Sequence, residues 1–141
     1  MDFRKLNKVT TEDAYPLPRI DDLLNALGKA KYMTTTDQFQ GFQVIPISKE
    51  DICKTAFITR RGQYEYLWMP FGLYNAPASF QQMMNYVYQD LIGRNVLVYI
   101  DDVIIYSETF KQYLQDLHKV FDTIWSSGLR LNTKKYFFGK H

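Results

Sequence analysis

The sequence has one cysteine, Cys53, two histidines and no long apolar run. One cysteine can form neither an intrachain disulfide nor a cysteine-based zinc site, which fits a reducing, intracellular compartment. We expect Cys53 to be a small buried hydrophobic residue. No apolar run approaches the roughly 18 residues that a membrane-spanning helix needs, and no signal-peptide core is present. These absences exclude disulfide-rich and cysteine-zinc scaffolds, and no membrane partner is expected.

The chain also has little net charge, +2 at pH 7, so its total charge does not indicate a nucleic-acid binder. The distribution of charge is more informative. Residues 129–141 contain four basic residues and no acidic one, and the opening MDFRKLNK is also rich in basic residues. Two basic ends could meet a polyanion or could be solvated surface segments, and charge alone does not choose between these.

The 141 residues are 46% hydrophobic and 16% aromatic, which is enough for one domain with its own core. Apolar spacing predicts helices over 20–27, 75–93 and 109–128. We expect the last helix to pack through Leu114, Leu117, Val120, Phe121, Ile124 and Trp125. Strand-like composition predicts strands over 31–37, 41–47, 96–100 and 103–107, two more joined at RRGQ, and a basic strand near the end. This order predicts an α+β fold, an antiparallel sheet with helices on one face.

The run VLVYIDDVIIY places Asp101 and Asp102 between two apolar strands. A two-residue hairpin turn at these positions fits the pattern, but Asp-Asp is a poor choice for turn geometry alone. Neighbouring carboxylates repel each other and are partly desolvated beside apolar strands, so they need a cation or raised pKa values. A divalent cation such as Mg²⁺ would satisfy both carboxylates. The alternative is an exposed acidic turn.

Asp37 ends a second predicted strand and has no nearby acidic residue to share its charge. A third carboxylate from an adjacent strand would complete a two-metal site for phosphoryl transfer. Four other acidic residues lie at a helix start or in a polar turn, where the helix dipole and solvation explain them: Asp21, Asp22, Glu50 and Asp51.

Residues Tyr99 to Asp102 match the Y-x-D-D box of reverse transcriptases. The chain resembles the polymerase of gypsy-like LTR retrotransposons and their retroviral relatives along nearly its whole length. Six phrases carry the resemblance in family order: DFRKLNKVT, YPLPRIDDLL, KTAFIT, YEYLWMPFGLYNAPASFQQMMN, VLVYIDDVIIYS and GLRLNTKK. A single Y-x-D-D would be a weak signal, whereas six ordered phrases are a strong one.

The resemblance implies that residues 1–141 form the palm of a right-hand polymerase with part of the fingers. It further implies that the thumb and any RNase H domain lie outside this sequence. The expected function is RNA-directed DNA polymerisation within a retrotransposon polyprotein, with weak or no activity for the 141-residue segment by itself. The expected partners are an RNA or DNA template with its primer, dNTPs, and the thumb, RNase H and integrase of the polyprotein. Two alternatives stay open: a non-catalytic remnant that at most binds nucleic acid, and another two-metal enzyme such as a nucleotide cyclase.

The resemblance also assigns catalytic roles. Asp37 and Asp101 would hold two Mg²⁺ ions, which Mn²⁺ can replace, while Asp102 assists and the backbone carbonyl of Gln38 is a further ligand. Lys135 matches a lysine that the family uses to protonate pyrophosphate, although the adjacent Lys134 is a rival. The alternative for both lysines is a solvated surface charge.

The remaining implied roles concern nucleotide and template. The backbone of Phe39, Gln40 and Gly41 would lie near the triphosphate, and Phe42 would be the aromatic gate that rejects a 2′-hydroxyl. The alternative for Phe42 is the first residue of a core strand. Segment 69–73 would line the nucleotide and template pocket, or could be only a tight turn. Its Phe71 is expected at the nucleotide, and the residues expected at template or primer are Arg4, Lys5, Pro70, Gly72 and Tyr99, with Arg4 and Lys5 in a fingers strand.

Overall fold

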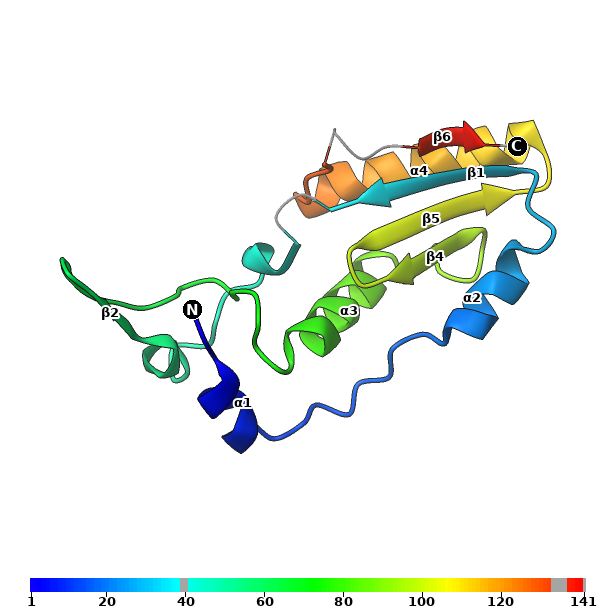
Figure 1. Cartoon of the computed structure of the whole chain (residues 1–141). Coiled ribbons are helices and arrows are strands. Elements are labelled where there is room, and N and C mark those ends of the chain that lie inside the picture. Colours follow the sequence, from blue (N-terminus) through cyan, green and yellow to red (C-terminus); the bar gives the residue numbers. More distant parts are fainter. Residues whose placement is uncertain (39–40, 133–136, 141) are drawn as a thin grey trace.

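A computed structural model describes residues 1–38 and 41–132 in full and the backbone of residues 137–140. The helices are α1 (Arg4–Val9), α2 (Ile20–Leu27), α3 (Ala76–Val87) and α4 (Phe110–Ser127), with two 3₁₀ helices, η1 (Gly41–Val44) and η2 (Ile52–Thr55). The strands are β1 (Tyr32–Asp37), β2 (Phe57–Thr59), β3 (Gly62–Tyr64), β4 (Val96–Tyr99), β5 (Asp102–Ser107) and β6 (Phe137–Lys140). Figure 1 shows this order, with the β2–β3 hairpin extending away from the main sheet.

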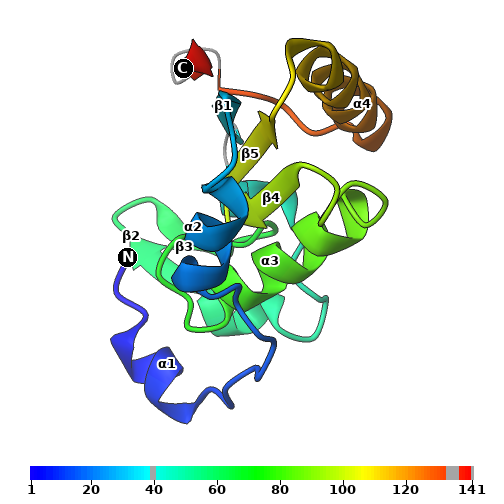
Figure 2. The same cartoon turned by 90° about the vertical axis from the view of Figure 1, so that its right-hand side faces the viewer.

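The main sheet has the strand order β4-β5-β1-β6, and its neighbouring strands are antiparallel. Helices α3 and α4 lie on the same side of this sheet (Figure 2). This arrangement confirms the predicted fold class, an antiparallel sheet covered on one face by helices. The order also places β1 beside β5, which brings the ends of two distant sequence segments together.

The core lies between the sheet and these two helices. Most of its members come from α3, α4, β4 and β5, and Tyr88 directly follows α3. They include Phe80, Met84, Tyr88, Val98, Val103, Ile105 and Val120. Burying an apolar side chain of this size stabilises the fold by about 1.5–3 kcal/mol. The apolar side chains of α3 therefore form the surface that packs against the sheet.

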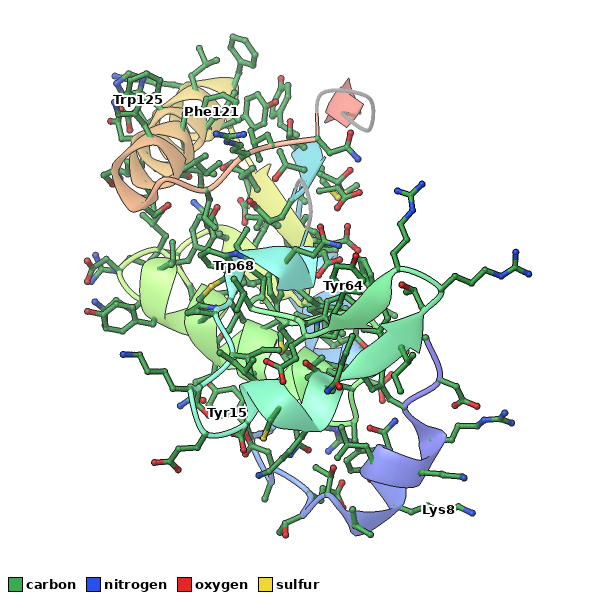
Figure 3. The ribbon with its side chains drawn as sticks, turned by 90° about the vertical axis from the view of Figure 1, so that its left-hand side faces the viewer. Lys8, Tyr15, Tyr64, Trp68, Phe121 and Trp125 are labelled. Atoms are coloured by element: carbon green, nitrogen blue, oxygen red, sulfur yellow. The ribbon has the colours of Figure 1, made fainter. Side chains whose placement is uncertain are left out.

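Helix α4 begins and ends where its sequence signals predict. The Thr109 hydroxyl accepts a hydrogen bond from the Gln112 amide at 3.3 Å, and Gly128 ends the helix in the left-handed conformation, with φ 72°. The prediction that Leu114 and Trp125 pack in the core is wrong, because these residues are 47% and 90% exposed. Figure 3 shows Trp125 on the outer side of α4. Ile124, one residue or about 100° earlier around the helix, is buried as predicted.

Asp116 is a buried acidic residue that fastens α4 to the β4–β5 hairpin. Its carboxylate accepts hydrogen bonds from Asn95 and Gln112, each at 2.9 Å, and from the Ser107 hydroxyl at 3.2 Å. A buried carboxylate is tolerated only with such partners. The network therefore ties α4 to Asn95, just before β4, and to Ser107, at the end of β5.

Further local predictions are wrong. The helix predicted over 75–93 ends at Val87. Residues 41–47 do not form a strand, because Gly41 takes a positive φ of 24° and the chain turns into η1. Arg4 and Lys5 lie in the helix α1 rather than in a strand, and the Asp2 carboxylate accepts the Arg4 backbone N–H at 3.0 Å. Cys53 is exposed, because η2 lies in a surface turn.

The N-terminal segment is held against the start of α3 by two asparagines. Asn7 donates to the Gly72 carbonyl at 2.8 Å and accepts from the Tyr74 amide at 2.9 Å. Asn75 donates to the Thr11 carbonyl and accepts from a backbone amide of the same segment. Within the part of the chain described, no helix is both long and apolar enough to cross a bilayer.

Candidate active site

Strands β1 and β5 place Asp37 and Asp102 directly opposite each other. The register of this antiparallel pair runs from Tyr32 opposite Ser107 to Asp37 opposite Asp102. Directly opposed residues in an antiparallel pair present their side chains on the same face, with Cβ atoms about 4.5–5.5 Å apart. Two carboxylates that are 65 positions apart in the sequence thus meet at one end of the sheet.

The hairpin between β4 and β5 differs by one residue from the sequence prediction. Tyr99 pairs with Asp102, so the two turn residues are Ile100 and Asp101 rather than the two aspartates. Ile100 takes a φ of 51°, a left-handed conformation that is unfavourable for a β-branched residue. The shift leaves Asp102 in the strand, where it faces Asp37, and puts Asp101 in the turn beside them.

Asp101 is held close to the backbone on two sides. Its carbonyl accepts the Gln38 amide at 3.2 Å, which joins the turn to the residue after Asp37. Its carboxylate lies against Gly41, where a Cβ atom would stand 3.1 Å from Oδ2. A Cβ at this position would be in tight contact with the carboxylate, which would have to shift by a few tenths of an ångström. The segment after α4 also reaches the site, since the Asn132 amide donates to the Asp37 carbonyl at 2.9 Å.

The donor set suits a hard divalent cation, although the side chains do not form a closed cluster. Carboxylate and carbonyl oxygens are the ligands that Mg²⁺ prefers. Among the described residues, no three acidic, histidine or cysteine side chains converge as metal ligands. Neighbouring carboxylates repel one another, and a bound cation would offset this repulsion. Asp102 is exposed, and Asp37 and Asp101 are partly exposed.

Gln38 has a buried side chain beneath the aspartates. Its Nε2 donates to the Tyr88 hydroxyl at 3.4 Å, and its Oε1 is buried without a hydrogen bond from the described residues. Burial raises the pKa of the Tyr88 phenol, an effect that the hydrogen bond from Gln38 partly offsets. The residue that follows α3 therefore contacts the residue that follows Asp37 through a hydrogen bond between neutral groups.

The two predicted nucleotide-pocket aromatics touch each other. The rings of Phe42 and Phe71 are 5.4 Å apart between centroids, in an edge-on arrangement. Phe42 also contacts the buried Phe80 at 5.4 Å, whereas Phe71 is 60% exposed. Phe42 thus lies between the core and an open surface, so its core role and its predicted gate role are compatible.

Two of the predicted template residues flank this aromatic pair. Pro70 is buried and Gly72 is exposed with a φ of 93°, which few side chains tolerate. Tyr99 pairs with Asp102 next to the turn. Arg4 and Lys5 are not brought to the aspartates. They lie on α1, which Figure 1 shows away from the ends of β1 and β5, and Arg4 pairs with Asp2 at 2.6 Å.

Four predicted site residues, Phe39, Gln40, Lys134 and Lys135, lie outside the described residues. One residue that the sequence reading missed is Gln81, which is buried in α3 and bonded to the hairpin that carries the aspartates. A signal was present: Gln81 precedes Asn85 by four positions and Tyr88 by seven, so polar groups recur along the core-facing side of an otherwise apolar helix.

The cavities lie beside the aspartates rather than around them. One of about 610 Å³ lies between α1, the 45–55 segment and the start of α3, and Asn7, Met69 and Asn75 are among its lining residues. Another of about 710 Å³ is lined by Trp68, Pro70 and Arg130, among others. Neither includes Asp37, Asp101 or Asp102. The chemistry of the aspartates and not the size of a cavity therefore defines the candidate site.

Comparison with known proteins agrees with this geometry. Residues 1–141 match the family described as reverse transcriptase (RNA-dependent DNA polymerase). The Pol polyprotein from transposon 297 of Drosophila melanogaster is 46% identical over 140 residues, covering 99% of this chain and 13% of the polyprotein. An RNA-directed DNA polymerase homolog from Oenothera berteroana is 40% identical over 123 residues, covering 85% of this chain and 87% of that protein. The chain belongs to the reverse transcriptase family.

Solved structures agree with the fold. The prototype foamy virus protease-reverse transcriptase superposes with a TM-score of 0.88 at 31% identity, covering 99% of this chain and 18% of the viral one. A foamy viral protease-reverse transcriptase in complex with an RNA/DNA hybrid superposes with a TM-score of 0.87 at 29% identity, covering 97% of this chain and 18% of that chain. The chain spans only a small part of these multidomain relatives.

Proposed function

We propose that this chain forms the catalytic palm and part of the fingers of an RNA-directed DNA polymerase. It extends a primer on an RNA or DNA template with dNTPs, together with thumb, RNase H and integrase segments of one polyprotein. One observation carries the proposal: Asp37 and Asp102 lie directly opposite each other on paired strands, and Asp101 lies in the adjoining turn. The transposon polyproteins and the viral enzyme bound to an RNA/DNA hybrid support it by similarity.

The proposed metal ligands are the carboxylates of Asp37, Asp101 and Asp102 and the backbone carbonyl of Gln38. Two Mg²⁺ ions, or Mn²⁺ in their place, would lower the pKa of the primer 3′-hydroxyl and neutralise charge on the triphosphate when bound. The chain holds these oxygens where β1 ends and β5 begins in the main sheet. The ions would supply the positive charge that offsets the repulsion between these carboxylates.

The remaining residues orient the reactants. The 3′-oxygen of the primer attacks the α-phosphorus of the dNTP, the bond to the β-phosphate oxygen breaks, and pyrophosphate leaves. We assign the triphosphate to the backbone of Phe39, Gln40 and Gly41, and the proton for pyrophosphate to Lys135. The supporting observation is that Asn132, three positions before Lys135, already bonds to Asp37.

Sugar and template contacts complete the proposal. Phe42 is the proposed barrier to a 2′-hydroxyl, and its contact with Phe71 supports a shared nucleotide pocket. Pro70, Gly72 and Tyr99 would contact template or primer close to the chemistry. Arg4 and Lys5 are proposed only as template-phosphate contacts farther along α1, where their charges suit a nucleic-acid backbone.

The experiment that tests this function replaces the matching segment of the transposon 297 polyprotein with residues 1–141. The hybrid enzyme should extend a labelled primer on an RNA template with dNTPs. Asp101→Asn should abolish extension, because it removes a carboxylate needed for the metals, while the exposed Asp90→Asn should not. A folded hybrid that stays inactive beside an active transposon enzyme would refute the proposal, as would unchanged extension by Asp101→Asn.

A further inference from the structure

Gln81 is a neutral polar side chain with no exposed surface, in a helix whose neighbouring buried residues are Phe80 and Met84. Its Oε1 accepts the backbone N–H of Ile100 at 2.6 Å. Its Nε2 donates to the Val98 carbonyl at 3.2 Å and to Asn85 Oδ1 at 2.9 Å. Two of these three bonds go to one short segment, the end of β4 and the first residue of the turn. Gln81 therefore fastens α3 to the hairpin that carries Asp101 and Asp102.

The bonded residue, Ile100, is in an unfavourable backbone conformation. A β-branched residue at a φ of 51° is disfavoured, and such conformations persist only where the surroundings over-determine them. The bond from Ile100 to Gln81 is the contact that fixes this peptide group from the helix side. Without an acceptor, the partly buried N–H would be unsatisfied, and the turn would be free to relax toward an ordinary conformation.

A relaxed turn would move Asp101 in particular. Asp101 is the second turn residue, its carbonyl bonds to the Gln38 amide, and its carboxylate touches Gly41. A rotation at Ile100 would therefore change the position of Asp101 relative to both Asp37 and the 3₁₀ helix η1. The buried side chain of Gln81, 20 positions before Asp101 in the sequence, therefore influences the position of the Asp101 carboxylate.

We infer that Gln81 is a positioning residue that holds the Ile100–Asp101 turn in the conformation in which the aspartates bind divalent cations. The inference rests on the proposed function, since it gives the aspartates their metal role. It adds a residue that touches neither metal nor nucleotide. Gln81 acts through the Ile100 peptide group, so its loss affects cation affinity beyond any effect on the stability of the core.

The test measures Mn²⁺ binding to the 141-residue chain by electron paramagnetic resonance of free Mn²⁺, with folding checked by circular dichroism. Gln81→Met keeps the size of the side chain but removes the acceptor for Ile100. Its matched control, Gln82→Met, makes the same change at the exposed neighbouring position. We expect the Mn²⁺ dissociation constant to rise about tenfold or more for Gln81→Met, as for the loss of other second-layer partners of metal ligands, and to stay unchanged for Gln82→Met.

The outcomes separate the possible roles. A destabilised Gln81→Met that binds Mn²⁺ as wild type would overturn the inference and leave Gln81 as a core residue. Equal Mn²⁺ binding by wild type and Asp101→Asn would instead overturn the proposed metal site, and the inference with it. If Gln81→Met does not fold, Gln81→Asn keeps an amide in the core but is too short to reach Ile100, and the same loss of affinity is expected. Wild-type affinity in a folded Gln81→Asn would count against the role.

Discussion

The ring of Phe42 stands edge-on to the ring of Phe71, with 5.4 Å between their centroids. The two residues are 29 positions apart and belong to different local structures, η1 and the turn before α3. Phe42 makes a second edge-on contact with Phe80, which has no exposed surface. The Phe42 ring thus contacts both the core and the surface where the proposed function places a nucleotide. Its replacement should therefore affect both the stability of the fold and the selection of the nucleotide sugar.

Phe42→Ala should lower the free energy of unfolding by about 2 kcal/mol, less than the loss for a fully buried phenylalanine because the ring is only partly buried. Phe71→Ala, at an exposed ring, should cost less than about 1 kcal/mol. Urea denaturation of both variants measures the difference. In the transposon hybrid, Phe42→Ala should also admit ribonucleotides more readily, seen as a lower deoxy-to-ribo ratio of kcat/KM. An unchanged ratio would leave Phe42 as a packing residue only.

Gly41 gives the second prediction, because two constraints meet at this position. A Cβ there would lie 3.1 Å from the Asp101 carboxylate, and the φ of 24° is already unfavourable for other residues. Gly93 has a comparable positive φ, 80°, but no atom near the position of a Cβ. Both Gly41→Ala and Gly93→Ala should cost about 1 kcal/mol of stability from backbone strain. Only Gly41→Ala should also weaken Mn²⁺ binding, because it displaces Asp101.

Thermal melts with and without Mn²⁺ compare the two alanine variants directly. A bound ion stabilises the folded chain in proportion to its affinity, so Gly93→Ala should keep the Mn²⁺-dependent rise in Tm and Gly41→Ala should lose most of it. If both variants keep the rise, the carboxylate of Asp101 does not need the space at Gly41. If both lose it, backbone strain rather than the contact is responsible.

The elements that the sequence predicts well are those with a complete local signal. Helix α4 has an apolar period, a threonine cap and a glycine stop, and β1 ends at Asp37 as its composition indicates. The family resemblance adds the order of these elements and is confirmed by the match over residues 1–141. Local signals therefore suffice where periodicity and caps agree.

The features that the sequence does not predict depend on contacts between distant segments. The turn at Ile100 and Asp101 is one residue earlier than its composition suggests, because Gln81 accepts the Ile100 amide and stabilises an unfavourable φ. Residues 41–47 have strand-like composition, but Gly41 turns the chain where it meets Asp101. In both places a tertiary contact outweighs local preference, and both places lie at the candidate site.

The third prediction concerns pH and Tyr88. Burial raises the pKa of this phenol above its ordinary value near 10, and the hydrogen bond from Gln38 offsets only part of the effect. Above pH 10 the phenol therefore ionises in the unfolded chain but stays protonated in the folded one. The unfolded state then binds fewer protons, so the contribution of Tyr88 to stability is complete below pH 10 and is lost as pH rises, by about 1.4 kcal/mol per pH unit.

Tyr88→Phe isolates this contribution from the other groups that titrate at high pH. At pH 7 the variant should be less stable than wild type by about 1 kcal/mol, because it loses the hydrogen bond with Gln38. Between pH 10 and 11.5 this deficit should shrink and then reverse, since phenylalanine does not ionise in either state. Tyr86→Phe, at a side chain that is 74% exposed, should follow the wild-type curve throughout. Urea denaturation at half-unit steps of pH measures all three proteins, and parallel curves for wild type and Tyr88→Phe would show that the phenol ionises as easily in the folded chain as in the unfolded one.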